Sequence, residues 1–229
     1  MRALCVRFKD CEGPGIIESV LRENGYRVSF HNAYDLRVQL LPEAHLNFNL
    51  IVLLGGPQSV TDPDLDSFFQ PYYMLVKNMM ANHGRKLIGI CLGSQIIAKA
   101  LGAEVFVGDK GPEVGFSPMK IRDVTHPIFK GINQPEIQAF HLHEDTFSIP
   151  KGATHLLESD LYKNQMFAVE NKVFAFQAHI EPTLPMLEVW KNVHKDFIAQ
   201  GNGDFKNLAE KQKEMETSAR IIFRNILYT

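Results

Sequence analysis

The order of hydrophobic and polar positions gives the two halves of the chain a different character. In the first half, short apolar runs alternate with segments whose apolar residues recur at helical spacing, as in residues 15–24. This alternation is typical of parallel strands covered by helices on both faces. The strands expected there are residues 4–8, 26–30, 50–54 and 86–90, and the helices are residues 15–24, about 64–82 and 94–101.

The second half has short apolar stretches with tight connections. The strands expected there are residues 114–121, 137–141, 155–158, 165–170 and 172–177, with a hairpin turn at Asn171-Lys172. Helical patterning returns at about residue 184, and residues 205–227 are amphipathic. We therefore expect one α/β domain over residues 1–229, with a mixed, mostly parallel central sheet. A C-terminal helical extension, about residues 184–229, is expected to pack on it.

Composition and charge narrow the classes of function. The 229 residues carry a formal net charge of -2, so the chain lacks the basic character of proteins that bind nucleic acid or anionic membranes. No stretch approaches the roughly 18 apolar residues of a membrane span. The N-terminus resembles a first strand rather than a signal peptide, and three cysteines are too few and scattered for a disulfide framework. We expect a cytoplasmic protein with a small neutral or zwitterionic substrate.

Cys91 stands where an expected strand meets an expected helix. With Gly89 and Gly93 it completes the pattern G-x-C-x-G, the cysteine form of a nucleophile elbow. The glycines remove side chains that would clash in the sharp turn, and the helix N-terminus favours a thiolate. The alternative is a small buried structural cysteine. Cys5 and Cys11 lack such a frame and are expected to be structural.

A base and its orienting acid are expected at the end of another strand. His179 and Glu181 are two residues apart, so in extended backbone they share a face. The carboxylate can then hold one imidazole nitrogen while the other faces a thiol. An isolated H-x-E is more typical of a structural histidine beside a surface acid. The catalytic interpretation gains from the position at a strand end, because loops at one sheet edge carry the sites of α/β domains.

Backbone donors for a developing oxyanion are expected at two places. Gly55 and Gly56 follow a buried strand and would let backbone N–H groups approach a substrate closely. The N–H of Leu92, directly after Cys91, is the usual second donor of an elbow. Taken alone, the two glycines are equally consistent with a plain strand-to-loop turn.

Three segments together resemble the signature blocks of class I glutamine amidotransferases. They read LGGPQS at residues 54–59, GICLGSQ at 89–95 and QAHIE at 177–181, in the family's order and approximate spacing. Residues 113–116 and 141–147 are also similar to blocks of the stand-alone GMP-synthase-like group. The resemblance covers roughly residues 1–190. It implies a flavodoxin-like, three-layer α/β fold.

The resemblance also implies an activity, the hydrolysis of the side-chain amide of glutamine by a Cys-His-Glu triad. Cys91 would attack the amide carbon, and His179, braced by Glu181, would take the thiol proton and deliver it to departing ammonia. A γ-glutamyl thioester would form and be hydrolysed, with the N–H groups of Gly56 and Leu92 holding the oxyanion. No cofactor is expected.

The sequence departs from the family pattern in places. Ser94 stands where the family often has histidine, and Ala178 and Ile180 stand where it often has phenylalanine and proline. None is a triad position, so we expect them to change the shape of the pocket rather than the catalytic residues. Nothing like an ATP-pyrophosphatase or other synthase domain follows, so the chain is not expected to be a GMP synthase by itself.

The substrate contacts that we expect are Gly55, Gln95, His141 and His143. The pair His141 and His143, followed by Glu144 and Asp145, could also hold a metal or be structural. That pattern is weak, and we expect no metal. The remaining histidines are expected to be structural: His31, His45, His83, His126, His155 and His194.

Three functions remain open. The first is glutamine amide hydrolysis, with ammonia passed to a synthase partner or released. The second is hydrolysis of γ-glutamyl peptides or conjugates by the same triad, and the size of the pocket near residues 141–147 would separate the two. The third is a catalytically silent regulatory scaffold, which the presence of all three triad residues disfavours. The C-terminal stretch either packs on the domain or forms a homodimer or partner surface.

Overall fold

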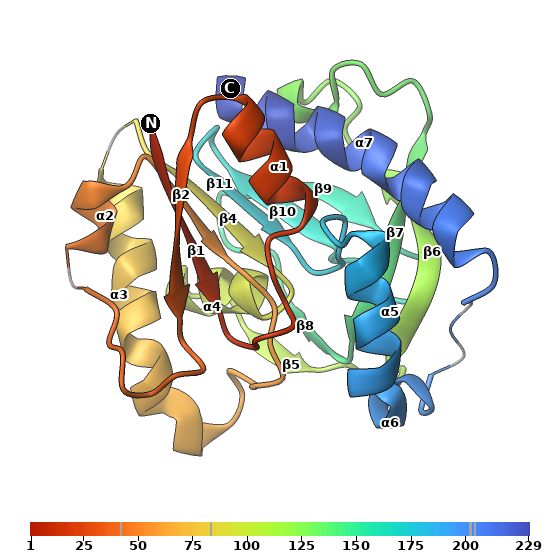
Figure 1. Cartoon of the computed structure of the whole chain (residues 1–229), viewed down its shortest axis with the longest axis horizontal. Coiled ribbons are helices and arrows are strands. Elements are labelled where there is room, and N and C mark those ends of the chain that lie inside the picture. The colour runs from red at the N-terminus through yellow and green to blue at the C-terminus, as the bar shows by residue number, and fades with distance from the viewer. Residues whose placement is uncertain (42, 83, 202, 204) are drawn as a thin grey trace.

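The computed structural model describes residues 1–41, 43–82, 84–201, 203 and 205–229. Within these residues a nine-stranded sheet lies between two groups of helices (Figure 1). The strands are β1 (Arg2–Arg7), β2 (Arg27–Asn32), β3 (Leu50–Leu53), β4 (Lys86–Ile90), β5 (Val105–Val107), β6 (Glu113–Ile121), β7 (Glu136–His143), β8 (Asp145–Phe147), β9 (Thr154–Glu158), β10 (Met166–Val169) and β11 (Val173–Phe176). The helices are α1 (Ile16–Glu23), α2 (Ala44–Asn47), α3 (Asp66–Ala81), α4 (Leu92–Ala100), α5 (Leu184–Val193), α6 (Lys195–Ile198) and α7 (Leu208–Tyr228), with 3₁₀ turns η1 (Pro63–Leu65) and η2 (Pro127–Phe129).

The order of strands brings distant loops to one edge of the sheet. The order is β2-β1-β3-β4-β11-β10-β9-β6-β7. The first five strands are mutually parallel, and the remaining pairs are antiparallel. This parallel part follows the flavodoxin-like order, in which ligands bind beyond the carboxyl ends of the strands. The segments after β1, β3, β4 and β11 therefore meet at one edge.

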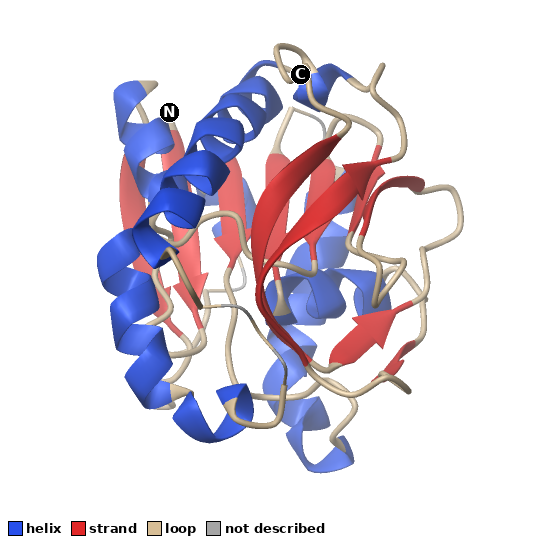
Figure 2. Ribbon diagram, turned by 90° about the vertical axis from the view of Figure 1, so that its right-hand side faces the viewer, coloured by secondary structure: helices blue, strands red, loops and turns tan. Residues whose placement is uncertain are grey.

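The parallel strands are buried on both faces, which explains their continuous apolar runs. In β1, Ala3 and Cys5 pack toward α1, α5 and α7, whereas Leu4 and Val6 pack toward α3 and α4. Figure 1 shows α1, α5 and α7 in front of the sheet and α4 behind it. Figure 2, turned so that the edge formed by β6 and β7 faces the viewer, shows the sheet between helices on both sides. The result is the expected three-layer fold.

The C-terminal helices pack on the front face of the sheet. The long helix α7 contacts α1, η2 and β7, and its buried face includes Met215, Ile222 and Phe223. In α5, Trp190 is fully buried against the same core. None of the described helices combines the length and apolar character that crossing a bilayer requires.

The structure differs from the predicted elements at the start of α4, in the short helix α2, which was not predicted, and in a small two-stranded sheet. Helix α4 begins at Leu92 rather than at residue 94, because Cys91 itself forms the helix boundary. The hairpin between β10 and β11 turns at residues 170–172, which includes the predicted Asn171-Lys172, and Glu170 has φ 51 there. The small sheet of β5 and β8 was missed. Its first strand is largely exposed, with Phe106 at 40% and Val107 at 56%, so no apolar alternation marked it.

Candidate active site

The backbone at Cys91 has the strained conformation of an elbow. Cys91 has φ 49 and ψ -110, between β4 and α4, a region that costs free energy for any residue other than glycine. Two hydrogen bonds hold the turn: Cys91 N–H donates to the Phe176 carbonyl at 2.8 Å, and Gly93 N–H donates to the Leu54 carbonyl at 3.1 Å. The sulfur is thereby fixed at the edge of the sheet where β3, β4 and β11 end.

The glycines of the elbow allow α4 to approach β3. A Cβ atom built on Gly93 would overlap the backbone carbonyl of Leu53, and backbone cannot move aside as a flexible side chain can. We expect Gly93→Ala to lower the free energy of unfolding by about 3 kcal/mol, the upper part of the range for overpacking. Chemical denaturation of the two proteins measures this.

Gly13→Ala is the matched control for that substitution. A Cβ on Gly13 meets no described atom within 4 Å, so its unfolding free energy should change by no more than about 0.5 kcal/mol. Equal stabilities of the Gly93→Ala and Gly13→Ala proteins would contradict the close packing of α4 on β3.

The imidazole of His179 is held on both sides. Its Nδ1–H donates to Glu181 Oε1 at 2.7 Å, and its backbone pairs with Phe140 through two N–H···O bonds of 2.9 Å. The ring is buried and packs edge-on against Trp190, with centroids 4.9 Å apart. Cys91 and His179 lie at the wall of the same cavity. The structure thus brings together Cys91, His179 and Glu181 from two distant segments.

Electrostatics at His179 favour the imidazolium. Burial by itself lowers the pKa of His179, because a charged ring is poorly solvated there. The charge of Glu181, the electrostatic interaction with Cys91 and the hydrogen bond to Glu181 outweigh burial and raise the pKa of His179 well above its usual value. A proton taken from the thiol can therefore stay on the ring, as a base beside a cysteine nucleophile requires.

Two glutamines and a carbonyl surround the sulfur. Gln177 Nε2 lies 3.8 Å from Cys91 Sγ as a donor, and Sγ lies 4.0 Å from the carbonyl oxygen of Leu142. Gln95 Nε2 donates to Gln177 Oε1 at 3.3 Å. Gln95, predicted as a substrate contact, also lines the cavity at the sulfur, whereas Gln177 was not predicted as a site residue.

The expected oxyanion donors are Gly56, at the cavity, and Leu92, directly after Cys91 in the chain. Gly56 lines the cavity with Cys91, and a Cβ on it would come 2.5 Å from Phe8 Cβ. Leu92 is the first residue of α4, so its N–H has no carbonyl acceptor in its own helix. Neither N–H donates to a backbone carbonyl in the described part of the chain. Of the two residues, Gly56 lines the cavity and Leu92 does not.

The cavity over Cys91 has a volume of about 300 Å³, at the lower end of the range for small-ligand sites. This volume suits a ligand the size of an amino acid or a short conjugate. Loops after β1, β3, β4, β7 and β11 contribute to it, as does the α5–α6 segment. Its lining residues are Glu12, Gly56, Pro57, Gln58, Ser59, Cys91, Gln95, Leu142, His143, Glu144, Asp145, His179, His194 and Phe197.

The other predicted contacts lie at the wall or behind it. His143 lines the cavity, whereas His141 is absent from its lining and is completely buried. Gly55 lies behind the wall, where a Cβ would overlap the Glu12 carboxyl and come 3.1 Å from His179 Cε1. Gly55 therefore makes room for these two side chains, which is a packing role.

His141 and His143 form a buried cluster with Glu113, which the sequence analysis did not pair with them. Glu113 Oε2 lies 3.2 Å from His141 Nδ1 and 3.1 Å from His143 Nε2, and Gln165 Nε2 donates to it at 2.7 Å. Burial alone would raise the pKa of Glu113, but hydrogen bonds to the two imidazoles and their charge hold it well below its usual range.

The three ligand atoms of this cluster lie within 4.8 Å of one another, so it is the group of described residues that could hold a metal ion. The expected partners Glu144 and Asp145 are not part of it. The carboxylate lies next to two imidazoles and accepts a hydrogen bond from an amide, so the cluster supports the cavity wall at His143. His141 Nδ1 and Gln165 Oε1 have no hydrogen-bond partner among the described residues.

Glu12 and His194 are among the cavity residues that were not predicted. Glu12 follows β1, whose loop reaches the same edge as the loops of β3 and β4, so the expected parallel sheet could have drawn attention to it. His194, expected to be structural, lines the cavity from the end of α5. His194 is far in sequence from the motifs, so no local pattern marked it as a site residue. His83 lies outside the described residues.

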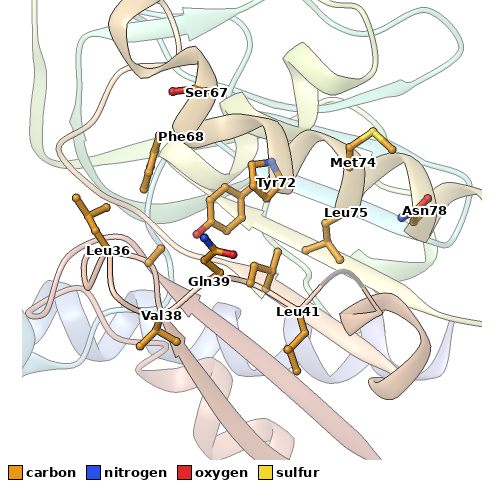
Figure 3. A pocket seen from close by; sticks show the side chains of 13 residues that line it. Leu36, Val38, Gln39, Leu41, Ser67, Phe68, Tyr72, Met74, Leu75 and Asn78 are labelled. Carbon is orange, nitrogen blue, oxygen red and sulfur yellow. The ribbon is translucent and has the colours of Figure 1, made fainter.

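A larger cavity, of about 590 Å³, lies between α3 and the segment after β2 (Figure 3). Its wall is mostly aliphatic and aromatic, with Leu36, Val38 and Leu41 facing Phe68 and Leu75. No carboxyl, imidazole or thiol group is among its described lining residues. It therefore lacks the groups that amide hydrolysis requires.

Comparison with known proteins agrees with this geometry. The family model for glutamine amidotransferase class-I matches residues 12–187. This chain belongs to the class I glutamine amidotransferase family. The match includes all three members of the Cys-His-Glu arrangement and ends within α5.

Relatives in the family carry different names. The chain is 30% identical to the glutamine amidotransferase-like protein YfeJ of Salmonella typhimurium, over 92% of this chain and 89% of that protein. It is 37% identical to one of the subunits of the glutamine-hydrolysing GMP synthase of Sulfolobus acidocaldarius, over 65% of this chain and 76% of that one. It is also 33% identical to gamma-glutamyl peptidase 2 of Arabidopsis thaliana, over 48% and 46% respectively.

The fold agrees with a solved family member. The crystal structure of a glutamine amidotransferase from Thermotoga maritima superposes with a TM-score of 0.88, at 25% identity, over 100% of this chain and 99% of that one. The agreement extends beyond residue 187, so helices α5 to α7 have counterparts in that structure.

Proposed function

We propose that this protein hydrolyses the side-chain amide of glutamine through a thioester on Cys91. The observation that carries the proposal is that Cys91 lies at the wall of one cavity with His179, whose ring is hydrogen-bonded to Glu181. The unengaged N–H groups of Gly56 and Leu92 support it, because they are available to an oxyanion bound at the sulfur.

In the first half of the proposed reaction, the sulfur of Cys91 attacks the amide carbon while His179 takes the thiol proton. The carbonyl oxygen becomes an oxyanion that accepts hydrogen bonds from the N–H groups of Gly56 and Leu92. His179 then protonates the nitrogen, the C–N bond breaks and ammonia leaves. A γ-glutamyl thioester remains on Cys91.

In the second half, water attacks the thioester carbon and His179 takes one of its protons. The C–S bond breaks, the sulfur regains its proton and glutamate leaves. The sum is glutamine and water converted to glutamate and ammonia. Glu181 holds the ring of His179 in one orientation throughout and stabilises its charged form. A relative named as part of a GMP synthase supports a synthase partner that receives the ammonia.

Hydrolysis of γ-glutamyl conjugates is the second candidate. It uses the same triad with an amine in place of ammonia. The cavity wall supplied by His194 and Phe197 favours it, because these residues lie beyond the segment that matches the family. A relative named as a gamma-glutamyl peptidase is in keeping with it. The test is release of ammonia and glutamate from glutamine, compared with release of free amino acids from γ-glutamyl dipeptides.

Selective alkylation provides a further prediction. We expect a glutamine-like electrophile to label Cys91 at least about tenfold faster than the other two cysteines, since reactivity follows thiolate character and access. Burial raises the pKa of Cys5 far above its usual value. Burial, and then the charges of Glu12 and Asp10, raise the pKa of Cys11. Peptide mapping by mass spectrometry gives the three rates, and faster labelling of Cys5 or Cys11 would contradict an activated Cys91.

A further inference from the structure

Glu12 is a buried carboxyl group at the cavity, and no described residue donates a hydrogen bond to its side chain. Only 5% of its surface is exposed, yet it lines the cavity with Cys91 and His179. Its nearest cationic candidate is His194, whose Nε2 lies 3.5 Å from Glu12 Oε1, too far for a good hydrogen bond. That Nε2 is itself buried without a partner among the described residues. Buried polar groups are normally paired, so we expect a ligand to bind this carboxyl group.

The fold holds Glu12 in this position. Gly55 leaves the space that the carboxyl occupies, since a Cβ there would overlap Glu12 Oε2. The preceding residue is fixed because Trp190 Nε1–H donates to the Cys11 carbonyl at 2.9 Å. Glu12 is therefore a built part of the wall rather than a mobile surface acid.

Glu12 is placed close to where the leaving group of the proposed reaction would lie. A Cβ built on Gly55 would meet both Glu12 Oε2 and His179 Cε1, so the carboxyl lies next to the ring of His179. In the proposed reaction His179 delivers its proton to the departing nitrogen. The substituent on that nitrogen would then face the wall formed by Glu12, His194 and Phe197.

We propose that Glu12 and Phe197 form a leaving-group subsite that selects γ-glutamyl amides whose amine part carries a positive charge, such as conjugates of a diamine. This inference rests on the proposed function and names a substrate class for it. A carboxylate forms charge-assisted hydrogen bonds with an ammonium group. The half-buried ring of Phe197 adds an aromatic face for the same cation.

The groups around Glu12 leave its charge available to a ligand. Lys9, His179, Glu181 and His194 are the charged or titratable groups that act on it. Burial, and then the charge of His179, lower the pKa of His194, so that its imidazole is neutral at pH 7. Burial raises the pKa of Glu12 to about 7. The charges of His179 and Lys9 lower this pKa, and the charge of Glu181 raises it further. The preference for a cation should therefore grow from pH 6 to 8, as Glu12 loses its proton.

The experiment compares two amides of equal length. One is the γ-glutamyl amide of 1,4-diaminobutane, which is cationic, and the other is the γ-glutamyl amide of pentylamine, which is neutral. We expect the wild type to prefer the cationic amide in kcat/KM by about 10- to 100-fold, the effect of one hydrogen bond to a charged group. Glu12→Gln should reduce the ratio to about one. The titration of His179 affects the hydrolysis of both amides equally, so it cancels in the ratio of their kcat/KM values.

Glu144→Gln is the matched control, because Glu144 lines the cavity from the segment after β7. We expect it to keep the preference, which separates a local contact from a general loss of negative charge. Binding of the cationic amide to Cys91→Ala protein, with and without Glu12→Gln, gives a second measurement that needs no turnover. Thermal unfolding checks that the Glu12→Gln protein is folded.

The outcomes separate the subsite from the proposed function. A wild type that hydrolyses glutamine but has a ratio near one, or a Glu12→Gln protein that keeps the wild-type ratio, overturns the subsite alone. The Glu12→Gln protein could lose turnover of glutamine but keep turnover of the glutamine analogue that lacks the α-amino group. That result would mean that Glu12 binds the α-ammonium group of the substrate, and it also overturns the subsite. A wild type that cleaves none of these compounds overturns the proposed function. In that case the subsite is also overturned if the Cys91→Ala protein binds the cationic and the neutral amide equally well.

Discussion

Replacing Cys91 with alanine is expected to lower ammonia release from glutamine by at least about 10⁴-fold, with little change in the fold. Loss of the nucleophile in triad enzymes leaves only the contribution of oxyanion donors and substrate binding. Alanine has no atom that can form the thioester, and it introduces no new contact at a side chain that is 7% exposed. A coupled assay for ammonia measures the rate, and circular dichroism verifies the fold.

Cys11→Ala is the matched control for the nucleophile. Cys11 is a free, partly buried cysteine next to the cavity residue Glu12. We expect its variant to keep turnover within about twofold, as is usual for substitutions away from the site. Equal turnover of the wild type and the Cys91→Ala protein would remove Cys91 from the mechanism and with it the proposed thioester.

Glu181→Gln is expected to lower kcat/KM for glutamine by about 10³- to 10⁴-fold. The estimate follows from triad enzymes, in which an amide in place of the orienting acid holds the wrong tautomer of histidine. The 2.7 Å bond from His179 Nδ1 to Glu181 Oε1 is buried, so water cannot readily substitute for the carboxylate. Steady-state kinetics at several glutamine concentrations separate the effect on kcat from that on KM.

The same substitution has a pH signature. Glu181 is the main group that raises the pKa of His179 against the effect of burial, so its replacement should lower that pKa. The imidazolium would then persist only at lower pH. We expect the residual alkylation of Cys91 by a glutamine-like electrophile to slow most at neutral pH, where the wild-type ring is still charged. An unchanged pH profile would contradict the electrostatic role of Glu181.

Glu188→Gln is the control for the removal of a glutamate from this region. Glu188 lies in α5, and its side chain is 56% exposed beside Lys191. Exposed ion pairs contribute at most about 1 kcal/mol to stability. Both the rate and the pH profile of this variant should match those of the wild type.

The two cavities illustrate why chemistry rather than size identifies the site. The cavity between α3 and the segment after β2 is about twice as large, at 590 against 300 Å³. Only the smaller one has a thiol, an imidazole and a buried acid among its described lining residues. Its groups come from the carboxyl ends of parallel strands, where the open sheets of α/β folds bind ligands.

The sequence by itself determined the elements with strong periodicity and the residues with local motifs. The runs that became β1, β3 and β4 were evident because burial on both faces makes a strand continuously apolar. Cys91 was evident because its glycines mark a strained turn, and the spacing of His179 and Glu181 placed both on one face of an extended segment. Each of these features depends on neighbours within a few positions of the chain.

Only the tertiary structure decided which distant side chains meet. Placing β11 beside β4 sets His179 against Cys91, and the register of β6 on β7 sets Glu113 against His143. The approach of α5 to the end of β1 brings His194 to Glu12. The physical reason is that a periodic pattern fixes which face of an element is buried. Strand order and register, which decide what that face contacts, arise from the packing of the whole chain.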